Sequence, residues 1–385
     1  MAHNLDVLKN FMDTQLEKFG FPGIDCIIYQ DHEEVFRYAA GYADMDTKQP
    51  PAPDALYHAY SGTKMITCTA AMQLVEQGKM LLLDPVSKYL PEYGNLMVKY
   101  GTFTVLPAQK KMRILDLFNM TAGISYEVDT PVMRAFAEET KGDFNTREFV
   151  AALAKDPLKF EPGDGWCYGF CHDVLGAIIE VISGKSLGEY LKENIFEPLG
   201  MKDTFFRIPE EKQPRLAPHY GYDFLTMTAS KIPNKNYGHA GLRQESGGAG
   251  LITSVNDYIL FADAMACIGV GKTGNRIISE RSIKLMSTNR LSGKFLEDFK
   301  QIGSAVGSAI GVGYGLGVGV VHDSVGACTL VPNGTFYWGG YGGFQNHIDT
   351  ENKLSFFVAM HNLRHPQHLL RPYMLNILYS NDWSK

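Results

Sequence analysis

The chain has 385 residues, of which 45% are hydrophobic and 20% are charged, and its formal net charge is −6 at pH 7. This composition is typical of a globular protein with a large buried core, divided into two or three structural units. The acidic balance gives no electrostatic reason to bind nucleic acid, and no apolar run of about 18 residues predicts a membrane span.

The N-terminal segment has the pattern of an amphipathic helix. Apolar residues recur at helical spacing from Leu5 to Phe19, and Gly20 is a typical helix stop. Asp6 and Lys9 interrupt any hydrophobic stretch, so the segment does not resemble a secretory signal peptide. The six cysteines are too sparse for a disulfide framework. These features predict a cytoplasmic protein with reduced thiols.

The next elements are a predicted hairpin and a long helix. Residues 24–29 and 34–38 have the composition of paired strands, and the polar residues 30–33 would form their turn. A helical pattern opens near residue 61 and runs to residue 77, where Gly78 ends it.

The following residues, from about 80 to 235, favour helices and loops, with helices expected over 114–120 and 174–182. From about residue 247 the chain becomes rich in glycine and in strand-like segments. We expect strands over 314–321, 335–338 and 354–360, a hairpin turn over 349–353 and a last helix over 367–379.

This order of elements predicts an α/β fold of the α+β type. An antiparallel sheet built from both chain ends would be flanked by helices, with a mostly helical domain inserted between its halves. The expected domains are residues 1–65 together with 240–385 for the sheet, and 66–239 for the helical part. The active site would lie between them.

A Ser-x-x-Lys pattern runs from Ser61 to Lys64 at the start of the predicted long helix. Chance alone places about one such pattern in a chain of this size, so the four residues are a weak signal by themselves. One interpretation is that Ser61 is only an N-cap. A structural capping box would carry Glu or Gln at the third position, whereas Lys64 opposes the helix macrodipole at a cost of roughly 0.3–1 kcal/mol.

The other interpretation gives the misplaced charge a chemical role. Residues three apart share a helix face, so the Lys64 amine can lie beside the Ser61 hydroxyl. Burial favours the neutral amine, which can accept the serine proton. The helix N-terminus also supplies backbone N–H groups for a developing oxyanion.

Several segments together resemble the serine β-lactamase and penicillin-binding-protein superfamily. Ser61-Gly62-Thr63-Lys64 is similar to its first motif, and Phe160-Glu161-Pro162-Gly163 with Tyr168 is similar to the region of its second. Further matching segments are Leu83-Asp84-Pro85-Val86, Ile114-Leu115-Asp116-Leu117, Thr121-Ala122-Gly123-Ile124, Ile195-Phe196-Glu197-Pro198-Leu199-Gly200-Met201 and Gly247-Gly248-Ala249-Gly250-Leu251. The resemblance spans almost the whole chain and implies a β-lactamase/transpeptidase-like fold.

Two departures place the resemblance in one branch of that superfamily. Tyr168-Gly169-Phe170 lacks the Asn of the Tyr-x-Asn motif of class C β-lactamases, and Trp338-Gly339-Gly340 stands where those enzymes carry Lys-Thr-Gly. Both variants resemble class C-like esterases, the family VIII carboxylesterases and the lovastatin acyltransferase-like branch. Loss of the strand lysine removes the cation that would hold a β-lactam or peptide carboxylate, which puts β-lactam hydrolysis in doubt.

The resemblance implies that Ser61 is the nucleophile and Tyr168 the general base and acid. A neighbouring Lys64 cation would favour the phenolate form of Tyr168. Which of the two groups takes the serine proton stays open, because they would titrate as a coupled unit. The alternative is that Tyr168 is an aromatic residue of the core with a packing role only.

The same resemblance implies an oxyanion hole beside the Trp338-Gly339-Gly340 strand. Gly339 and Gly340 would let the strand approach the acyl carbonyl closely. The backbone N–H of Tyr341 would form the hole with that of Ser61. Trp338 and Phe170 would line the substrate pocket. The alternative is a glycine-rich strand end with a packed tryptophan.

Other motif matches are expected to be accidental. Ser186 fits G-x-S-x-G, but a helix rather than a strand precedes it, so we expect a turn residue. Lys272-Thr273-Gly274 matches the third β-lactamase motif by letter, without a strand around it. We expect no metal and no other cofactor, because Pro366 breaks the spacing of the possible ligands His361, His365 and His368. Cys167 and Cys171 are expected to be small packed thiols.

These observations predict a serine esterase or transacylase that acts on a small carboxylic ester through an acyl-enzyme. Its partners would be the ester and an alcohol acceptor. Two alternatives stay open. One is a β-lactamase or D-alanyl carboxypeptidase, disfavoured by the missing strand lysine. The other is a catalytically silent binding protein on the same fold.

Overall fold

The computed structural model describes residues 4–233, 241–301, 310–363 and 370–383. Within these ranges the largest sheet has seven strands in the order β2-β1-β13-β12-β11-β10-β9, and all neighbours pair antiparallel. The strands are β1 (Gly23–Gln30), β2 (Glu33–Gly41), β9 (Val312–Tyr314), β10 (Gly319–Val321), β11 (Phe336–Gly340), β12 (Phe344–Asp349) and β13 (Leu354–Ala359).

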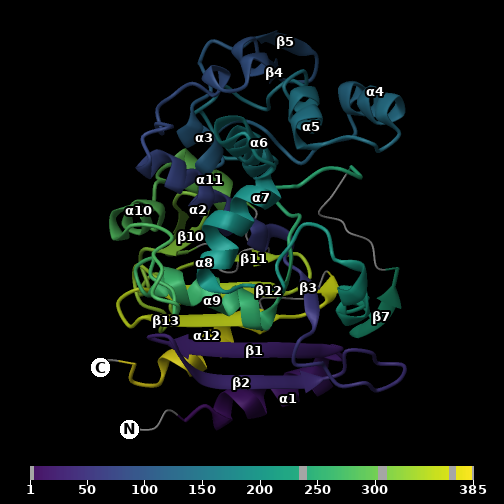
Figure 1. Ribbon diagram of the computed structural model, residues 1–385, viewed down its shortest axis with the longest axis vertical. Coiled ribbons are helices and arrows are strands. Elements are labelled where there is room, and N and C mark those ends of the chain that lie inside the picture. The colour runs from purple at the N-terminus through teal and green to yellow at the C-terminus, as the bar shows by residue number, and fades with distance from the viewer. Residues whose placement is uncertain (1–3, 234–240, 302–309, 364–369, 384–385) are drawn as a thin grey trace.

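The sheet lies toward the end of the molecule where both chain termini emerge (Figure 1). Its middle strands β12 and β13 are buried along their whole length, which explains why Leu354–Ala359 is nearly continuously apolar. Helix α9 (Val255–Ala266) packs against β1, β12 and β13. Helices α1 (Asp6–Phe19) and α12 (Arg371–Tyr379) pack together beside this sheet.

The remaining helices gather at the other end of the molecule or along its flank (Figure 1). They are α2 (Thr63–Glu76), α3 (Ile114–Phe118), α4 (Pro131–Thr140), α5 (Thr146–Leu153), α6 (Cys171–Ser183), α7 (Leu187–Leu191), α8 (Glu197–Leu199), α10 (Glu280–Met286) and α11 (Lys294–Lys300). Helix α2 is central: every residue from Thr63 to Leu74 is buried, and it packs against α6.

Short strands complete the frame around the start of α2. Strand β3 (Leu56–His58) pairs with β8 (Ile252–Ser254), and β3 leads directly into the 3-10 turn Tyr60–Gly62. That turn contacts β11 and β12. The others are β4 (Met97–Tyr100) with β5 (Thr104–Pro107), and β6 (His219–Asp223) with β7 (Thr228–Ile232) and β14 (Asn362–Leu363). No helix within the described ranges has the length and apolar character needed to cross a membrane.

The predicted order of strands, helices, strands and a closing helix is confirmed. The single strand predicted over 314–321 is wrong: β9 and β10 form a hairpin there, because Gly317 has a left-handed φ of 83° and reverses the chain. The first part of the last predicted helix, and the proposed domain boundary at 239/240, lie outside the described residues. The division into two domains stays a prediction.

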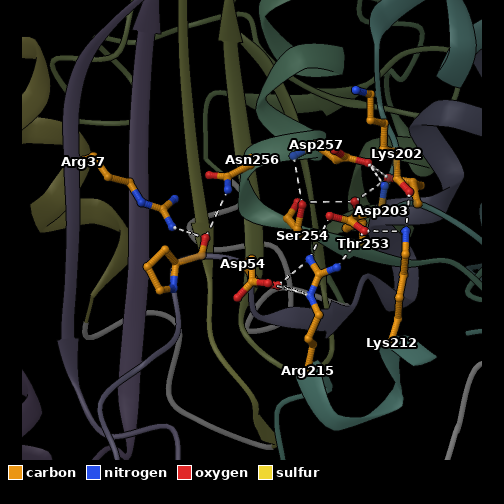
Figure 2. A network of polar contacts seen from close by, with 12 residues as sticks. Arg37, Asp54, Lys202, Asp203, Lys212, Arg215, Thr253, Ser254, Asn256 and Asp257 are labelled. Carbon is orange, nitrogen blue, oxygen red and sulfur yellow. Dashed lines mark hydrogen bonds and ion pairs between the residues drawn. The ribbon is translucent and has the colours of Figure 1, made fainter. Parts of the chain in front are cut away.

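A polar network ties the segment after α8 to the start of α9 (Figure 2). The Asp203 carboxylate accepts hydrogen bonds from Arg215, at 2.7 and 2.9 Å, and from Lys212 at 2.7 Å. The backbone N–H of Asp203 in turn donates to the Asp257 carboxylate at 2.6 Å. Hydrogen bonding to Arg215 holds the pKa of Asp203 below its usual value. The network therefore fixes the loop that leads into β6 against the helix that follows β8.

We expect Asp203→Asn to lower the free energy of unfolding at pH 7 by about 1–2 kcal/mol, measured by urea denaturation. The Arg215 and Asp203 side chains are 23% and 22% exposed, which keeps the loss below that of a fully buried pair. Because folding lowers this pKa, the stabilisation is complete above the unfolded value near 3.8 and is lost as pH falls through the folded value.

Lys300→Ala is the matched control, since Lys300 and Glu297 are 36% and 66% exposed and their ion pair is worth less than about 0.5 kcal/mol. An Asp203→Asn loss no larger than that of the control would contradict a stabilising role for the network.

Candidate active site

Ser61 lies in the middle of the 3-10 turn Tyr60–Gly62, which we call the Ser61 turn. Its side chain does not cap α2, whose N-cap is Gly62, so the N-cap interpretation of Ser61 is wrong. Tyr60 has a left-handed φ of 46°, a strained conformation for a large side chain. A Cβ atom on Gly62 would lie 2.2 Å from the Phe344 ring, so only glycine lets the turn pack this closely onto β12.

Lys64 is completely buried in the first turn of α2. Its ammonium donates hydrogen bonds to Ser61 Oγ at 3.3 Å, to the Tyr126 hydroxyl at 2.7 Å and to the Gly248 carbonyl at 2.5 Å. Among the described residues, no carboxylate lies within ion-pair distance of it. Neutral dipoles alone therefore solvate this lysine, and one of them is the hydroxyl of Ser61.

Two buried titratable groups on α6 surround the lysine at longer range. The Asp173 carboxylate accepts a hydrogen bond from Ser246 Oγ at 2.5 Å, and burial raises its pKa while Lys64 and this bond lower it. Burial, with the charge of Lys64, lowers the pKa of His172 to about 3. His172 therefore stays neutral at physiological pH and adds no second cation next to Lys64.

Tyr168 presents its ring face to the lysine. Lys64 Nζ lies 4.8 Å from the ring centroid, and the Tyr168 hydroxyl accepts a hydrogen bond from Trp338 Nε1 at 3.1 Å. No hydrogen bond joins Tyr168 to Ser61 or Lys64 among the described residues. The structure therefore places Tyr168, Lys64 and Trp338 together, with the phenol held by a side chain of β11; their catalytic roles stay predictions.

Tyr126 is the site residue that sequence reasoning missed. Its hydroxyl is the direct partner of Lys64, and its ring packs edge-on against Tyr168 and Phe170, with centroids 5.3 and 4.6 Å apart. The hydroxyl end is buried although 38% of the residue is exposed. This burial is the main cause that raises the pKa of Tyr126, and the nearby Tyr168 raises it further. The sequence did contain a signal for Tyr126, because this residue closely follows the family-like segment that ends at Ile124.

The end of β11 forms the wall opposite α2. A Cβ atom on Gly340 would lie 2.3 Å from the Ala59 carbonyl oxygen, so the missing side chain lets β11 touch the Ser61 turn. Gly339 is partly buried and Trp338 buried, while Tyr341 is 47% exposed with its ring edge-on to Tyr60 at 6.1 Å. The predicted oxyanion position of the Tyr341 N–H is thus next to the Ser61 turn; its role stays a prediction.

Glycines also bring the loop before β8 onto the lysine. A Cβ atom on Gly248 would lie 2.4 Å from the Asp173 carboxylate and 3.4 Å from Lys64 Nζ. The neighbouring Gly247 carbonyl accepts a hydrogen bond from Thr67 of α2 at 2.8 Å. This close packing explains why a carbonyl oxygen, rather than a side chain, is the third partner of Lys64.

The expected accidental matches lie elsewhere in the fold. Ser186 caps α7, where its hydroxyl accepts a hydrogen bond from the Glu189 N–H at 3.2 Å. Thr273 belongs to an exposed loop, and its hydroxyl donates to the Pro198 carbonyl. His361 is buried, while His365 and His368 lie outside the described residues. All six cysteines are free thiols.

Comparisons with known proteins agree on one family. The family model described as Beta-lactamase matches residues 8–377. Protein Rv1367c of Mycobacterium tuberculosis (strain ATCC 25618 / H37Rv) is 33% identical over 259 residues, which cover 66% of this chain and 64% of the relative. The chain thus spans somewhat less than two thirds of that relative's length. Esterase EstB of Burkholderia gladioli is 27% identical over 284 residues, covering 69% of this chain and 70% of EstB.

A solved structure extends the likeness to the whole fold. EstCE1, described as a hydrolase with promiscuous acyltransferase activity, superposes with a TM-score of 0.80 and 22% identity. The superposition covers 97% of this chain and 98% of EstCE1. At this identity the comparison establishes the fold, which is the one predicted from the sequence.

We expect Gly340→Ala to lower the free energy of unfolding by about 1–3 kcal/mol, because the new methyl group forces β11 away from Ala59 and Phe344. Gly94→Ala is the control, since a Cβ atom there would meet only the Ser87 Cβ, at an ordinary 3.7 Å. Urea denaturation measures both variants. Equal stabilities would mean that the contact between β11 and the Ser61 turn is not tight.

Proposed function

Since the chain belongs to the Beta-lactamase family, we propose that it is a serine esterase or acyltransferase that forms an acyl-enzyme on Ser61. The observation that carries the proposal is the buried Lys64 ammonium, which has neutral partners and lies 3.3 Å from Ser61 Oγ. A lysine with this surrounding stabilises no ion pair, so its burial is best explained by chemistry at the neighbouring hydroxyl.

In the acylation step Ser61 Oγ attacks the carbonyl carbon of an ester. A new Oγ–C bond forms, the C–O bond to the alcohol breaks, and the serine proton passes to the departing alkoxide, which leaves as an alcohol. Water or a second alcohol then attacks the acyl carbon, the Oγ–C bond breaks to release the acid or the new ester, and the proton of the nucleophile returns to Ser61 Oγ. Hydrolysis and acyl transfer differ only in this second nucleophile.

Lys64 and Tyr168 move the proton in this scheme. Lys64 touches the serine oxygen, and its ammonium also lies over the ring face of Tyr168. The Trp338 indole hydrogen bond holds the Tyr168 oxygen in place. The raised pKa of Tyr126 makes it a neutral hydrogen-bond partner that positions Lys64. The N–H groups of Ser61 and Tyr341 stabilise the oxyanion.

A small carboxylic ester is the substrate class we propose. Strand β11 offers Trp338 and two glycines at the position where a β-lactamase would need a cation, and Lys272 is in a distant loop paired with Glu33. EstB is named an esterase and EstCE1 is described as a hydrolase with promiscuous acyltransferase activity, which supports an ester in place of a β-lactam. A D-alanyl peptidase and a silent binding protein are the alternatives that experiment must exclude. The cytoplasmic location stays a prediction.

The experiment that tests this function is intact-protein mass spectrometry after brief exposure to a short-chain activated ester. We expect one acyl group, mapped by peptide to Ser61, and no adduct on Ser61→Ala. Ser186→Ala is the matched control and should be acylated normally, because Ser186 caps a helix. Absence of both adduct and ester turnover in folded protein would favour the silent binding protein. Turnover of β-lactams as fast as esters would favour the peptidase or β-lactamase.

A second test compares the two phenols. We expect Tyr168→Phe to lower kcat by about 10²- to 10⁴-fold, as loss of a general base does. Tyr126→Phe should cost less than about 10-fold, since Lys64 keeps its contacts with Ser61 and Gly248. Steady-state kinetics with the activated ester measure both. The reverse order of effects would make Tyr126 the group that moves the proton.

A further inference from the structure

A second cluster of reactive side chains lies at the far end of α9 from the Ser61 turn. Asp31 and His32 form the turn between β1 and β2, while Cys267 directly follows α9 and Asp263 lies one helical turn before it. Near the other end of α9, the Tyr258 hydroxyl donates to the Gly62 carbonyl at 2.9 Å. At 1.5 Å per residue, about 13 Å of helix separates Tyr258 from Cys267.

The β1–β2 turn has an unusual composition. Asp31 and His32 both have positive φ angles, 50° and 71°, in a two-residue hairpin turn where Asn-Gly or Asp-Gly is favoured. The strained His32 is held by Asp263, whose carboxylate accepts hydrogen bonds from the His32 N–H at 3.1 Å and from Nδ1 at 2.7 Å. The turn therefore places an imidazole and a carboxylate side by side at positions where glycine would adopt the same φ with less backbone strain.

The side chains around this turn are arranged as a metal site would require. Asp31, His32 and Cys267 each place one possible ligand atom within 4.8 Å of the others. Asp263 is fully buried, and because a carboxylate only accepts, Nδ1 of His32 carries the proton and leaves Nε2 for a metal. A carboxylate that orients a histidine in this way is the usual second-shell partner of a metal ligand.

We propose that Asp31, His32 and Cys267 bind a zinc ion, with Asp263 orienting His32 and water as the fourth ligand. A mixed thiolate, imidazole and carboxylate set suits Zn²⁺ and disfavours Mg²⁺ and Ca²⁺, which take oxygen ligands. Zn–S and Zn–N bonds of about 2.3 and 2.0 Å place neighbouring ligand atoms roughly 3.5 Å apart. The ligand atoms lie within 4.8 Å of one another, so zinc binding would draw them together by up to about 1 Å.

The protons and ion pairs around the cluster would change when a metal binds. The Cys267 thiol donates a hydrogen bond to the buried Asp263 carboxylate at 3.8 Å. Zinc would displace the thiol proton, forming the Zn–S bond and releasing one proton to water. Lys353, which pairs with Asp31 at 2.9 Å, is the local cation that competes with the metal. Lys272 is nearby but pairs with Glu33 at 3.8 Å.

Zinc at this position would clamp the β1–β2 hairpin to the end of α9, joining His32 to Cys267, which comes 235 positions later in the chain (267 − 32). Sequence spacing could not suggest such a site, because its ligands come from two distant segments. The site is independent of acyl transfer, and Ser61→Ala should bind zinc like the unaltered protein.

The test is zinc binding to the full chain after removal of metals with a chelator, by equilibrium dialysis and by Co²⁺ titration. We expect one zinc per chain with micromolar or tighter affinity, a thiolate-to-cobalt charge-transfer band, and a higher Tm in zinc. Cys267→Ser should remove the band and weaken zinc binding more than about 100-fold, beyond the usual second-shell loss. Asp31→Asn keeps a residue suited to positive φ and should weaken binding too, whereas Lys353→Met should tighten it.

Cys328→Ser and His322→Ala are the matched controls, since both side chains are exposed and belong to another loop. Both variants should bind zinc normally. Circular dichroism checks that each variant is folded. The proposal is overturned if the protein binds no zinc, or if Cys267→Ser and Asp31→Asn bind it as tightly as the unaltered chain.

Discussion

The burial of Lys64 without a carboxylate partner is the constraint on which the rest of the site depends. An ammonium taken out of water loses hydration worth several kcal/mol, and an ion pair is the usual compensation. Here a serine hydroxyl, a phenol and a backbone carbonyl provide it. These three partners come from the Ser61 turn, the loop after α3 and the loop before β8, so the fold must bring three separate segments to one nitrogen atom.

Glycine makes that convergence possible, because each approach leaves no room for a side chain. Gly62 packs under the Phe344 ring, Gly340 against the Ala59 carbonyl, and Gly248 against Asp173. The first two contacts fix the Ser61 turn against β12 and β11, and the third fixes Gly248 O against the ammonium. The family-like motifs are therefore rich in glycine for steric reasons, and the reactive side chains are held from the backbone.

Much of this arrangement was predictable from local patterns. The helical spacing of apolar residues, the glycines that end helices and the strand-like segments predicted the order of elements. The position of Lys64 in a first helical turn indicated that Ser61 was more than an N-cap. Contacts between distant segments were not predictable in the same way. Tyr126 follows a recognised segment, yet only the fold places its hydroxyl 2.7 Å from Lys64. The hairpin at Gly317 was missed because its flanking residues read as one continuous strand.

On the proposed mechanism, the aromatic residues around Lys64 decide which nucleophile can reach an acyl-enzyme at Ser61. Tyr168 and Trp338 are fixed to each other by a hydrogen bond, and they close the site from the sheet side. Tyr341 is 47% exposed and forms the rim of the site, whereas the Tyr126 hydroxyl is buried against Lys64. A phenol at the rim can bind an alcohol as readily as water, whereas the lysine below is shielded from both. On the proposed mechanism, the balance between hydrolysis and acyl transfer is therefore set at the rim, by how long an acceptor alcohol excludes water there. The proton-moving groups beneath it serve either reaction unchanged.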